Sequence, residues 1–218
     1  LHRVDRRQRQ MCIRDRHRVL DVAVAPTVGP KLFTAFFESA LAEVPSIEIK
    51  MHSLGASEDT SEVLSGKYHA CILPRETRPD RKLDVRPLFR ERFVLGCSAK
   101  HPLAASDIVR GEDLLEFPFV DRLKCEFREQ ILDHFARREV LMRPRFRADR
   151  DDWVQRVVAD GEAICILPER SATAQGLVTR PIDGFVLERE VVIATVSGST
   201  APVEIRKIAQ MAARYAWN

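Results

Sequence analysis

The stretch DRLKCEFRE places a cysteine among cations, a combination that can do redox chemistry. Cys125 is close in sequence to Arg122, Lys124 and Arg128. The stretch is typical of a helix start, and both a helix N-terminus and nearby cations lower the pKa of a thiol and favour the reactive thiolate. One interpretation is a redox-sensing thiol, although no second cysteine lies close in sequence to form a disulfide. The other is a partly exposed, unreactive thiol.

A second kind of chemistry, the binding of a small anion, is indicated by loops that lead from strands into helices. The free N–H groups of a helix N-terminus suit a carboxylate or a phosphate, and such starts are expected near Thr27, Ser57 and Cys125. An arginine such as Arg122 adds a charge-assisted hydrogen bond. The plainer interpretation is that the hydroxyls only cap helices and the charged residues are solvated. The candidate ligand-contacting residues are Thr27, Val28, Gly29, Ser53, Gly55, Ser57, Pro74, Arg75, Asp121, Arg122, Asp149 and Gly161.

No catalytic or metal-binding signature accompanies these residues. The sequence has no G-x-S-x-G, G-x-G-x-x-G, Walker or H-E-x-x-H motif. Its six histidines are scattered without the spacing of metal ligands. We therefore expect a protein that is not an enzyme and that has no metal site and no cofactor.

An alternation of strands and helices must position the candidate loops. Residues 19–73 have the pattern β-α-β-α-β with short connections, which calls for a parallel sheet. The alternation restarts at FPFV, residues 117–120. The expected strands are 19–25, 47–51, 69–73, 92–98, 117–120, 145–149, 163–167, 177–182 and 189–197, and the expected helices are 30–44, 59–66, 126–139, 152–161 and 202–216.

The tetrapeptide CILP occurs twice, at residues 71–74 and 165–168. Each copy follows an apolar helix end and a glycine, so each closes a similar α/β unit. The repetition predicts two lobes with separate sheets, joined by two crossovers near Pro74, Arg75 and the strand at 189–197. Ligands of open parallel sheets bind at the carboxyl ends of the strands, so we expect the ligand in a cleft between the lobes.

The charge of the chain is concentrated at its start. The whole chain carries +3, and residues 1–18, with seven arginines and two aspartates, carry +5, which leaves −2 for the rest. This acidic body does not favour nucleic-acid binding. Residues 1–16 lack an apolar period and are interpreted as a disordered or non-native basic tail; a basic arm that grips nucleic acid is the alternative.

Cysteine usage and hydropathy bear on the compartment. Cys71, Cys97 and Cys165 lie inside apolar runs, and none of the five cysteines forms a C-x-x-C pair. This usage favours a reducing cytoplasm. No apolar stretch approaches the roughly 18 residues of a membrane span, and no signal peptide is found, so no membrane partner is expected.

The segments VLSGKYHACIL, RFVLGCSAKHPLA and DWVQRVVADGEAICILPE, in this order, carry a resemblance to a known family. From about residue 17 to the end, the chain is similar to the effector-binding domain of LysR-type transcriptional regulators. It departs from the family at DGEAICILP, where a second glycine often follows the first, and this departure concerns the loop at Gly161.

The resemblance implies an α/β, type 2 periplasmic-binding-protein-like fold, in which two Rossmann-like subdomains are joined by two crossover strands. The first subdomain would comprise 17–91 plus 195–218, and the second 92–194. It also implies a small-molecule effector in the cleft and a homodimer or higher homo-oligomer. Promoter DNA would be bound only through a winged helix-turn-helix preceding residue 17, for which this chain has no room.

Two further expectations complete this interpretation. Because Phe33, Phe36 and Phe37 cannot all face inward, we expect self-association through helix 30–44 and strand 47–51. We expect the effector to be anionic. The alternative functions are a solute-binding protein of a transporter with the same fold or, with no residues in its favour, an enzyme on that scaffold.

Overall fold

The chain forms two compact units, each assembled from segments that are distant in sequence. The computed structural model describes residues 18–55, 58–75 and 78–217, and the expected tail lies outside them. The first unit contains the residues up to Val24, then Phe33–Leu88 and Val192–Ala216; the second contains Ala25–Leu32, Phe89–Val191 and the residues from Trp217. Residues 25–32 thus belong to the second unit by their contacts, while the sequence boundaries 17–91, 92–194 and 195–218 stay a prediction.

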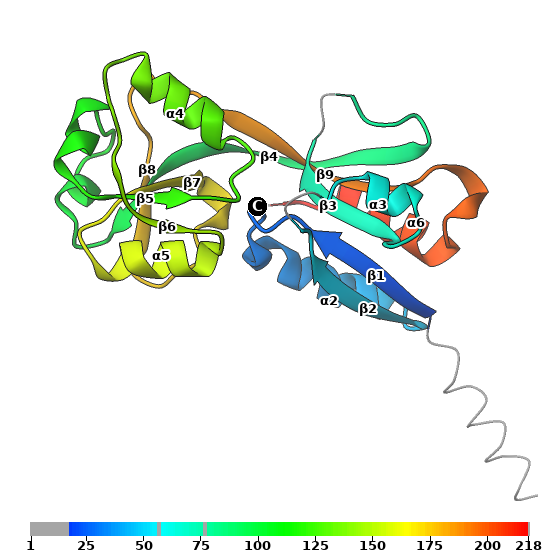
Figure 1. Ribbon diagram of the computed structural model, residues 1–218. Helices are drawn as coiled ribbons and strands as arrows, with labels where there is room; N and C mark the ends of the chain where they lie inside the picture. Colours follow the sequence, from blue (N-terminus) through cyan, green and yellow to red (C-terminus); the bar gives the residue numbers. More distant parts are fainter. Residues whose placement is uncertain (1–17, 56–57, 76–77, 218) are drawn as a thin grey trace, which may run out of the picture. The chain divides into compact units, whose positions relative to one another are not determined.

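The first unit is built on a parallel sheet, as the β-α-β-α-β pattern predicts. Strand β1 (Arg18–Val24) lies between β2 (Ile47–Ser53) and β3 (Ala70–Pro74) and pairs with both in parallel. Helices α2 (Phe33–Glu43) and α3 (Ser61–Leu64) connect these strands (Figure 1). The first CILP motif ends β3, so the predicted position of that motif is confirmed.

Helix α6 (Val203–Arg214) returns from the far end of the sequence to pack against α2. Its buried residues follow helical spacing and form one apolar face. Lys207 Nζ binds Glu43 Oε2 at 3.2 Å, and the ring of Tyr215 contacts Phe36 edge-on. The buried residues of the two helices are Phe33, Phe36, Ala40, Ile205, Ile208, Ala209 and Ala212.

The second unit contains strands of both orientations. Strand β4 (Leu83–Ser98) pairs antiparallel with β7 (Cys165–Pro168) and with β8 (Leu177–Arg180). Strand β5 (Phe119–Arg122) pairs in parallel with β6 (Pro144–Ala148). An isolated parallel bridge also joins Phe119 of β5 to Ile164, the residue directly before β7. The second CILP motif is β7 itself.

Helices α4 (Arg128–Ala136) and α5 (Asp151–Asp160) lie on opposite sides of these strands (Figure 1). Successive strand residues alternate between the two sides, because side chains along a strand point to opposite faces. Ile166 packs in the cluster with Ile131 and Phe135 of α4, whereas Leu167 packs with the valines of α5. The remaining short 3-10 helices are Pro30–Leu32, Pro102–Ala105, Glu112–Glu116, Glu169–Ser171 and Gly198–Thr200.

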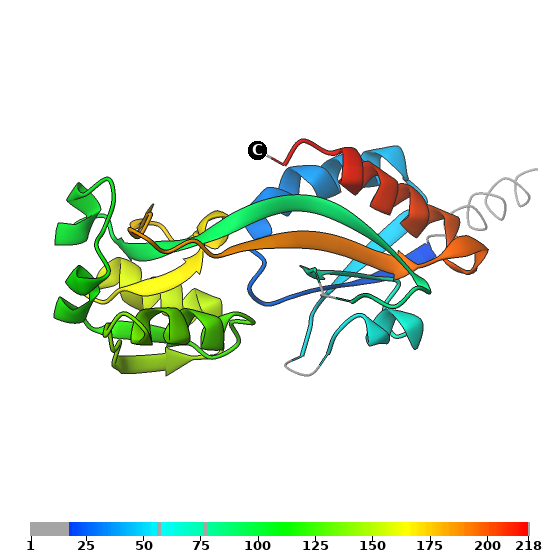
Figure 2. The same cartoon turned by 90° about the horizontal axis from the view of Figure 1, so that it is seen from above.

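Two expectations about this architecture are wrong. The strands pair along the path β2-β1-β3-β9-β4-β7, where β9 is Glu188–Val196, so the two units do not have separate sheets. The physical reason is that β4 and β9 are long, lie side by side (Figure 2), and each contributes residues to both units. The apolar positions Trp153, Val154, Val157 and Val158 predict one inward face of α5, but Trp153 is exposed. The buried face is centred on Val154 and Val158 and extends to Gln155 and Ala159, on the side away from Trp153.

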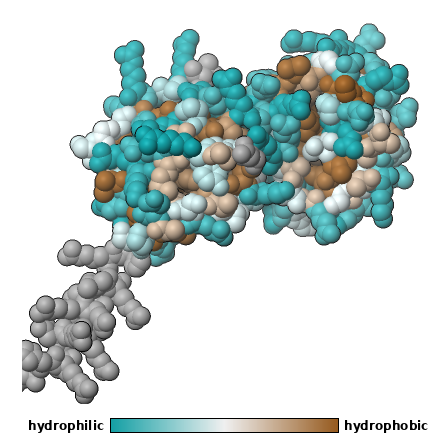
Figure 3. Space-filling view, turned by 180° about the vertical axis from the view of Figure 1, so that it is seen from behind, coloured by the Kyte–Doolittle hydropathy of each residue, from teal (hydrophilic) through white to brown (hydrophobic). Residues whose placement is uncertain are grey.

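The molecular surface in Figure 3 shows apolar side chains in small, separate groups among hydrophilic ones. The exposed large apolar residues come from many elements, as on most globular proteins. Within the described residues, no helix combines the length and the apolar character that crossing a bilayer requires.

Candidate functional site

The turn that follows β1 carries the first predicted site residues into a buried polar cluster of the second unit. The Oγ1 of Thr27 accepts a hydrogen bond from Arg189 Nη1 at 2.8 Å, and its carbonyl oxygen accepts one from Arg189 Nη2 at 2.8 Å. Both side chains are buried. Thr27 is therefore held on its hydroxyl and its backbone by one guanidinium, which fixes the turn.

Gly29 allows this turn to approach a second segment of the unit closely. A Cβ atom at Gly29 would lie 2.7 Å from Ser171 Cα and 2.9 Å from the carbonyl oxygen of Arg170, which is too close for any other residue. The hydroxyl of Ser171 donates to the Thr27 carbonyl oxygen at 2.8 Å. Glycine is thus required here by backbone contact, and the expectation that Thr27 caps α2 is replaced by this docking.

Arg189 is the centre of the cluster, and two carboxylates share its charge. Its Nη2 lies 2.7 Å from Glu91 Oε1, and its Nε donates to the same oxygen at 2.9 Å. Its Nη1 donates to Glu126 Oε1. An isolated buried cation is strongly unfavourable, so these carboxylates are what permits Arg189 to be buried.

Glu126 differs from the other members because water reaches it. Its side chain is 29% exposed, whereas those of Arg189 and Glu91 are almost fully buried. Its Oε2 accepts a hydrogen bond from Thr27 Oγ1 at 2.9 Å. The cluster thus has a buried ion pair, Arg189 with Glu91, and one further carboxylate, Glu126, at its solvent boundary.

Arg122, expected to bind the effector, is engaged within the protein. Its Nε donates to Asp151 Oδ1 at 2.9 Å, its Nη2 donates to Asp151 Oδ2, and the side chain is buried. Its Nη1 lies 3.5 Å from the carbonyl oxygen of Ile166. Arg122 therefore links β5 to the first turn of α5 and to β7. The acidic Asp151 also interacts favourably with the helix dipole at the N-terminus of α5.

The other charged candidates also have protein partners. Asp121 is buried and accepts from Arg128 Nε at 2.9 Å, with Arg147 Nε 3.4 Å from its Oδ2. Asp149 is exposed, with Lys124 Nζ 3.9 Å away. Among the described residues, no group of three or more His, Cys, Asp or Glu side chains is arranged to hold a metal ion.

The expectation that Cys125 has a lowered pKa is wrong. The thiol is buried, and burial raises its pKa, although the nearby Arg122 opposes the rise. Helix α4 begins only at Arg128, so Cys125 lies in the preceding turn and not in the first helical turn. Low exposure and a raised pKa both disfavour the thiolate that redox chemistry requires.

The remaining candidates are distributed over both units. Val28 is buried beside Thr27, and Gly161 ends α5 in an extended backbone conformation. In the first unit, Gly55 donates its N–H to Glu58 Oε2 at 2.6 Å. The other first-unit candidates are Ser53 at the end of β2, Pro74 at the end of β3, the exposed Arg75 that follows it, and Ser57, which lies outside the described residues.

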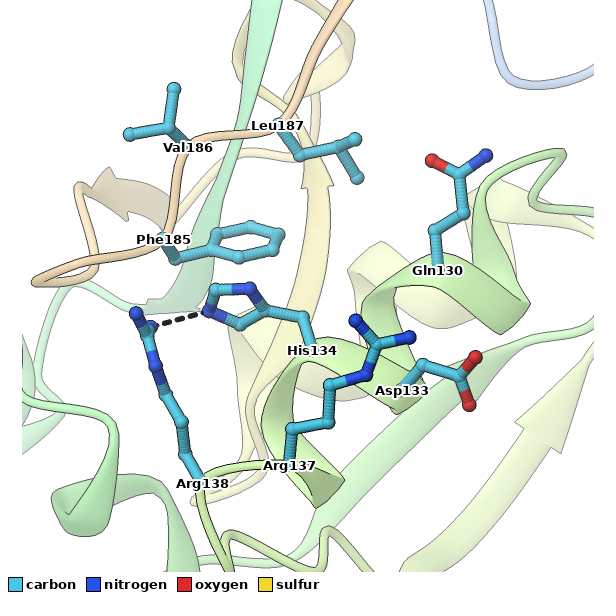
Figure 4. A pocket seen from close by; sticks show the side chains of 8 residues that line it. All are labelled: Gln130, Asp133, His134, Arg137, Arg138, Phe185, Val186 and Leu187. Carbon is cyan, nitrogen blue, oxygen red and sulfur yellow. Dashed lines mark hydrogen bonds between the residues drawn. The ribbon is translucent and has the colours of Figure 1, made fainter.

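Three cavities of the second unit differ greatly in size. The one beside Asp121, Arg122 and Cys125 has a volume of about 10 Å³, room for no more than one water molecule. Another, about 440 Å³, lies between α4 and residues 185–187, where Arg138 donates to His134 beneath the ring of Phe185 (Figure 4). The third, about 550 Å³, lies between residues 114–118 and residues 139–145. None of the predicted site residues lines either of the two large cavities.

The sequence reasoning missed Arg189, Glu91 and Glu126. A signal was present for the first two, because each has the same parity as the buried apolar residues of its strand. Glu91 lies two positions before the buried Phe93 on β4, and Arg189 lies two positions before the buried Val191 on β9, so each shares a face with its apolar neighbour. Two opposite charges on the buried faces of two strands indicate a buried ion pair.

Comparison with known proteins gives a match over nearly the whole chain. The family model described as LysR substrate binding domain matches residues 14–217. A probable nitrogen assimilation transcriptional activator of Synechocystis sp. is 24% identical over 182 residues, which cover 81% of this chain and 53% of that protein. The DNA-binding transcriptional dual regulator OxyR of Escherichia coli K12 is 26% identical over 151 residues, which cover 68% and 49%. The chain spans about half the length of these curated relatives.

Solved structures share the fold. The reduced form of the OxyR regulatory domain from Pseudomonas aeruginosa superimposes with a TM-score of 0.73 at 21% identity, covering 91% of this chain and 98% of that one. The regulatory domain of CcmR from Synechocystis PCC6803, in complex with 2-PG, gives a TM-score of 0.73 at 20% identity, covering 90% and 96%. The type of fold expected from the sequence is therefore confirmed.

Proposed function

Because the chain belongs to the LysR substrate-binding domain family, we propose that it is the ligand-sensing regulatory domain of a transcription regulator. The relatives support this role, since they are transcriptional activators and regulators. The whole regulator would bind promoter DNA through a domain outside the chain described here. We expect it to bind its effector without chemically converting it. We also expect it to act in the cytoplasm, because the promoter DNA that it would regulate lies there.

The effector we propose is a small anion that contacts the turn at Thr27. The observation that carries this proposal is the buried guanidinium of Arg189, which reaches the hydroxyl and the carbonyl oxygen of Thr27. A preformed cation with a hydroxyl beside it suits a carboxylate or a phosphate. The complex of CcmR with 2-PG is consistent with a small effector in this family.

Effector binding becomes a signal through a shift between conformations. A ligand favours the conformation to which it binds more tightly, in proportion to the difference in affinity. Thr27 lies in a short segment of the second unit, Ala25–Leu32, that is joined at both ends to the first unit. A ligand held at Thr27 therefore acts on a segment through which the chain passes from one unit to the other. Contacts of the effector with Ser53, Gly55 and Arg75 stay a prediction.

We also propose that the domain self-associates through α2 and β2. Strand β2 is at the end of the pairing path, and its Met51 is exposed, as is Leu41 of α2. Phe33 and Phe36 are buried and Phe37 is half-buried, so the apolar surface left for a partner is smaller than the aromatic pattern indicates. Sedimentation of the wild type and of Met51→Lys tests this; a dimer unaffected by Met51→Lys would place the interface elsewhere.

Calorimetry tests the effector proposal. A panel of small carboxylates and phosphate esters is titrated into the wild type, into Thr27→Val and into Thr34→Val, an exposed control on α2. A ligand that contacts Thr27 should lose about tenfold or more in affinity in Thr27→Val, as expected for a hydrogen bond to a charged group, and none in Thr34→Val. Equal affinity for all three proteins would mean that the effector site does not include Thr27.

A further inference from the structure

We propose that Thr27 Oγ1 and Arg189 Nη1 form a carboxylate-binding position, which Glu126 fills in this structure and which the carboxylate of an effector takes over. This inference rests on the proposed function, because it names the chemical class of the effector and the group that competes with it. The internal competitor is a side chain of the same unit. It is 99 positions from Thr27 and 63 from Arg189 in the sequence, and the turn between β5 and α4 brings it to them.

The geometry is that of a recognised carboxylate. One oxygen of Glu126 accepts from the hydroxyl of Thr27 at 2.9 Å, and the other accepts from Arg189 Nη1. Nη1 also donates to Thr27 Oγ1 at 2.8 Å, so that oxygen acts as acceptor from Arg189 and its hydrogen is directed to Glu126. Two donors are thereby presented to the two oxygens of one planar group, which is the arrangement that selects a carboxylate.

Burial makes the donors permanent and the carboxylate replaceable. Arg189 and Thr27 are buried, while the Glu126 side chain is partly exposed. When Glu126 leaves, Glu91 still holds Arg189 through Nε and Nη2. The guanidinium therefore stays in place and keeps Nη1 directed at the vacated position, which the carboxylate of a ligand can occupy with the same charge.

The turn that carries Glu126 does not depend on its side chain. The N–H of Cys125 donates to the carbonyl oxygen of Arg122 at 3.1 Å, and the N–H of Arg128 donates to that of Cys125 at 3.1 Å. The carboxylate can therefore rotate outward while these backbone bonds remain. A ligand binds only the fraction of molecules in which Glu126 has moved, so Glu126 lowers the apparent affinity for every carboxylate by that fraction.

Chemical rescue tests the inference directly. In Glu126→Ala, the position is vacant and acetate supplies the missing carboxylate. We expect sodium acetate at several times its dissociation constant to raise the melting temperature by about 2–4 °C over sodium chloride at equal ionic strength. The wild type should show no such difference. Glu129→Ala, which removes an exposed carboxylate from the next helix, is the matched control and should also show none.

Three outcomes would overturn the inference. They are no acetate-specific rise in Glu126→Ala, a rise of equal size in Glu129→Ala, and a rise that persists in the double variant Thr27→Val/Glu126→Ala. Inorganic phosphate is the competing probe, and a larger rise with phosphate would show that the position is not selective for carboxylates. Circular dichroism verifies that each variant folds; if Glu126→Ala does not, Glu126→Ser, whose side chain is too short to fill the position, replaces it, and acetate must still raise its melting temperature above that of the control.

The result is separable from that of the effector proposal. Effectors whose binding to the wild type depends on Thr27 support the proposed function even if acetate does not rescue Glu126→Ala. Conversely, rescue by acetate shows the carboxylate position even if no compound of the panel is the effector.

Discussion

Arg189 and Glu91 form an ion pair that is closed off from solvent, with Nη2 and Oε1 2.7 Å apart and side-chain exposures of 0% and 1%. The neighbouring pair on the same two strands, Arg90 and Glu190, is separated by 3.2 Å, and its arginine is largely exposed. The two pairs therefore offer a matched comparison of a buried and an exposed interaction.

Arg189→Met should destabilise the protein by about 3–5 kcal/mol, because it leaves Glu91 buried without its cation. Arg90→Met should cost at most about 1 kcal/mol, as exposed ion pairs contribute little. Urea denaturation of both variants measures the difference. Similar losses in the two variants would mean that Arg189 does not hold the cluster together.

Arg122→Lys should lower the free energy of unfolding by roughly 1–3 kcal/mol, because an ammonium cannot replace the two parallel bonds to Asp151. Lys124→Met, which removes the longer contact to the exposed Asp149, is the control and should have little effect. If Arg122→Lys is as stable as the wild type and binds the effector less tightly, the original assignment of Arg122 to the ligand was right.

Gly29→Ala should destabilise the protein by more than about 2 kcal/mol, since the added methyl group meets backbone atoms of Arg170 and Ser171 that cannot rotate away. Gly111→Ala is the control, because its methyl group would lie 3.8 Å from its nearest neighbours, in ordinary contact. Thermal melts compare the two. An unaffected Gly29→Ala would show that the turn is not docked on Ser171.

His101 should make the protein less stable as the pH falls from about 7 to about 5. Its Nδ1 accepts from the N–H of Leu103 at 3.1 Å, and its Nε2 lies 3.2 Å from the carbonyl oxygen of Glu162. Burial lowers its pKa below the usual 6.5. The unfolded state therefore binds the proton more tightly, and the stability present above pH 6.5 is lost as the pH falls through the folded-state pKa.

His101→Asn isolates this contribution, because asparagine can also cap the short helix at Pro102–Ala105 but does not titrate there. Its stability should depend less on pH over this range than that of the wild type. His134 contributes with the same sign, since burial and its arginine neighbours lower its pKa. An identical pH dependence of His101→Asn and the wild type would rule out the assigned role.

Cys125 should react slowly with iodoacetamide in the folded protein at pH 8, because burial both raises its pKa and blocks access. In urea it should react at the rate of an ordinary thiol. Mass spectrometry of the labelled peptides measures both rates. Rapid labelling of Cys125 in the folded state would restore the redox interpretation.

The repeating elements could be predicted from the sequence because their signals are local. The period of apolar residues and the glycine before each CILP motif identify β3 and β7 without knowledge of any distant contact. The partners of charged residues are a different matter. Arg122 and Asp151 are 29 positions apart, and Arg189 and Glu91 are 98 apart. No periodicity encodes such pairings, so the pairing of Arg122 with Asp151 was not predicted and Arg189 was overlooked.

The burial of Cys125 shows the same limit. Its sequence neighbours are cations, which favoured a low pKa, but the apolar residues that surround it come from other parts of the second unit, among them Phe93 and Ile166. Desolvation by distant residues is stronger here than the charge of near ones. Sequence neighbours therefore indicate which charges lie near a group, but they do not indicate well whether the folded protein shields that group from water.

The interleaving of the two units along the chain has a consequence for synthesis on the ribosome. Strands β1, β2 and β3 emerge early, yet α6, which belongs with them, emerges only after the whole of Phe89–Val191 has been made. Domains generally fold as units, and incomplete ones expose apolar surface. The nascent first unit must therefore wait with the surface of α2 that packs against α6 uncovered, and it is during this interval that chaperones have most to bind.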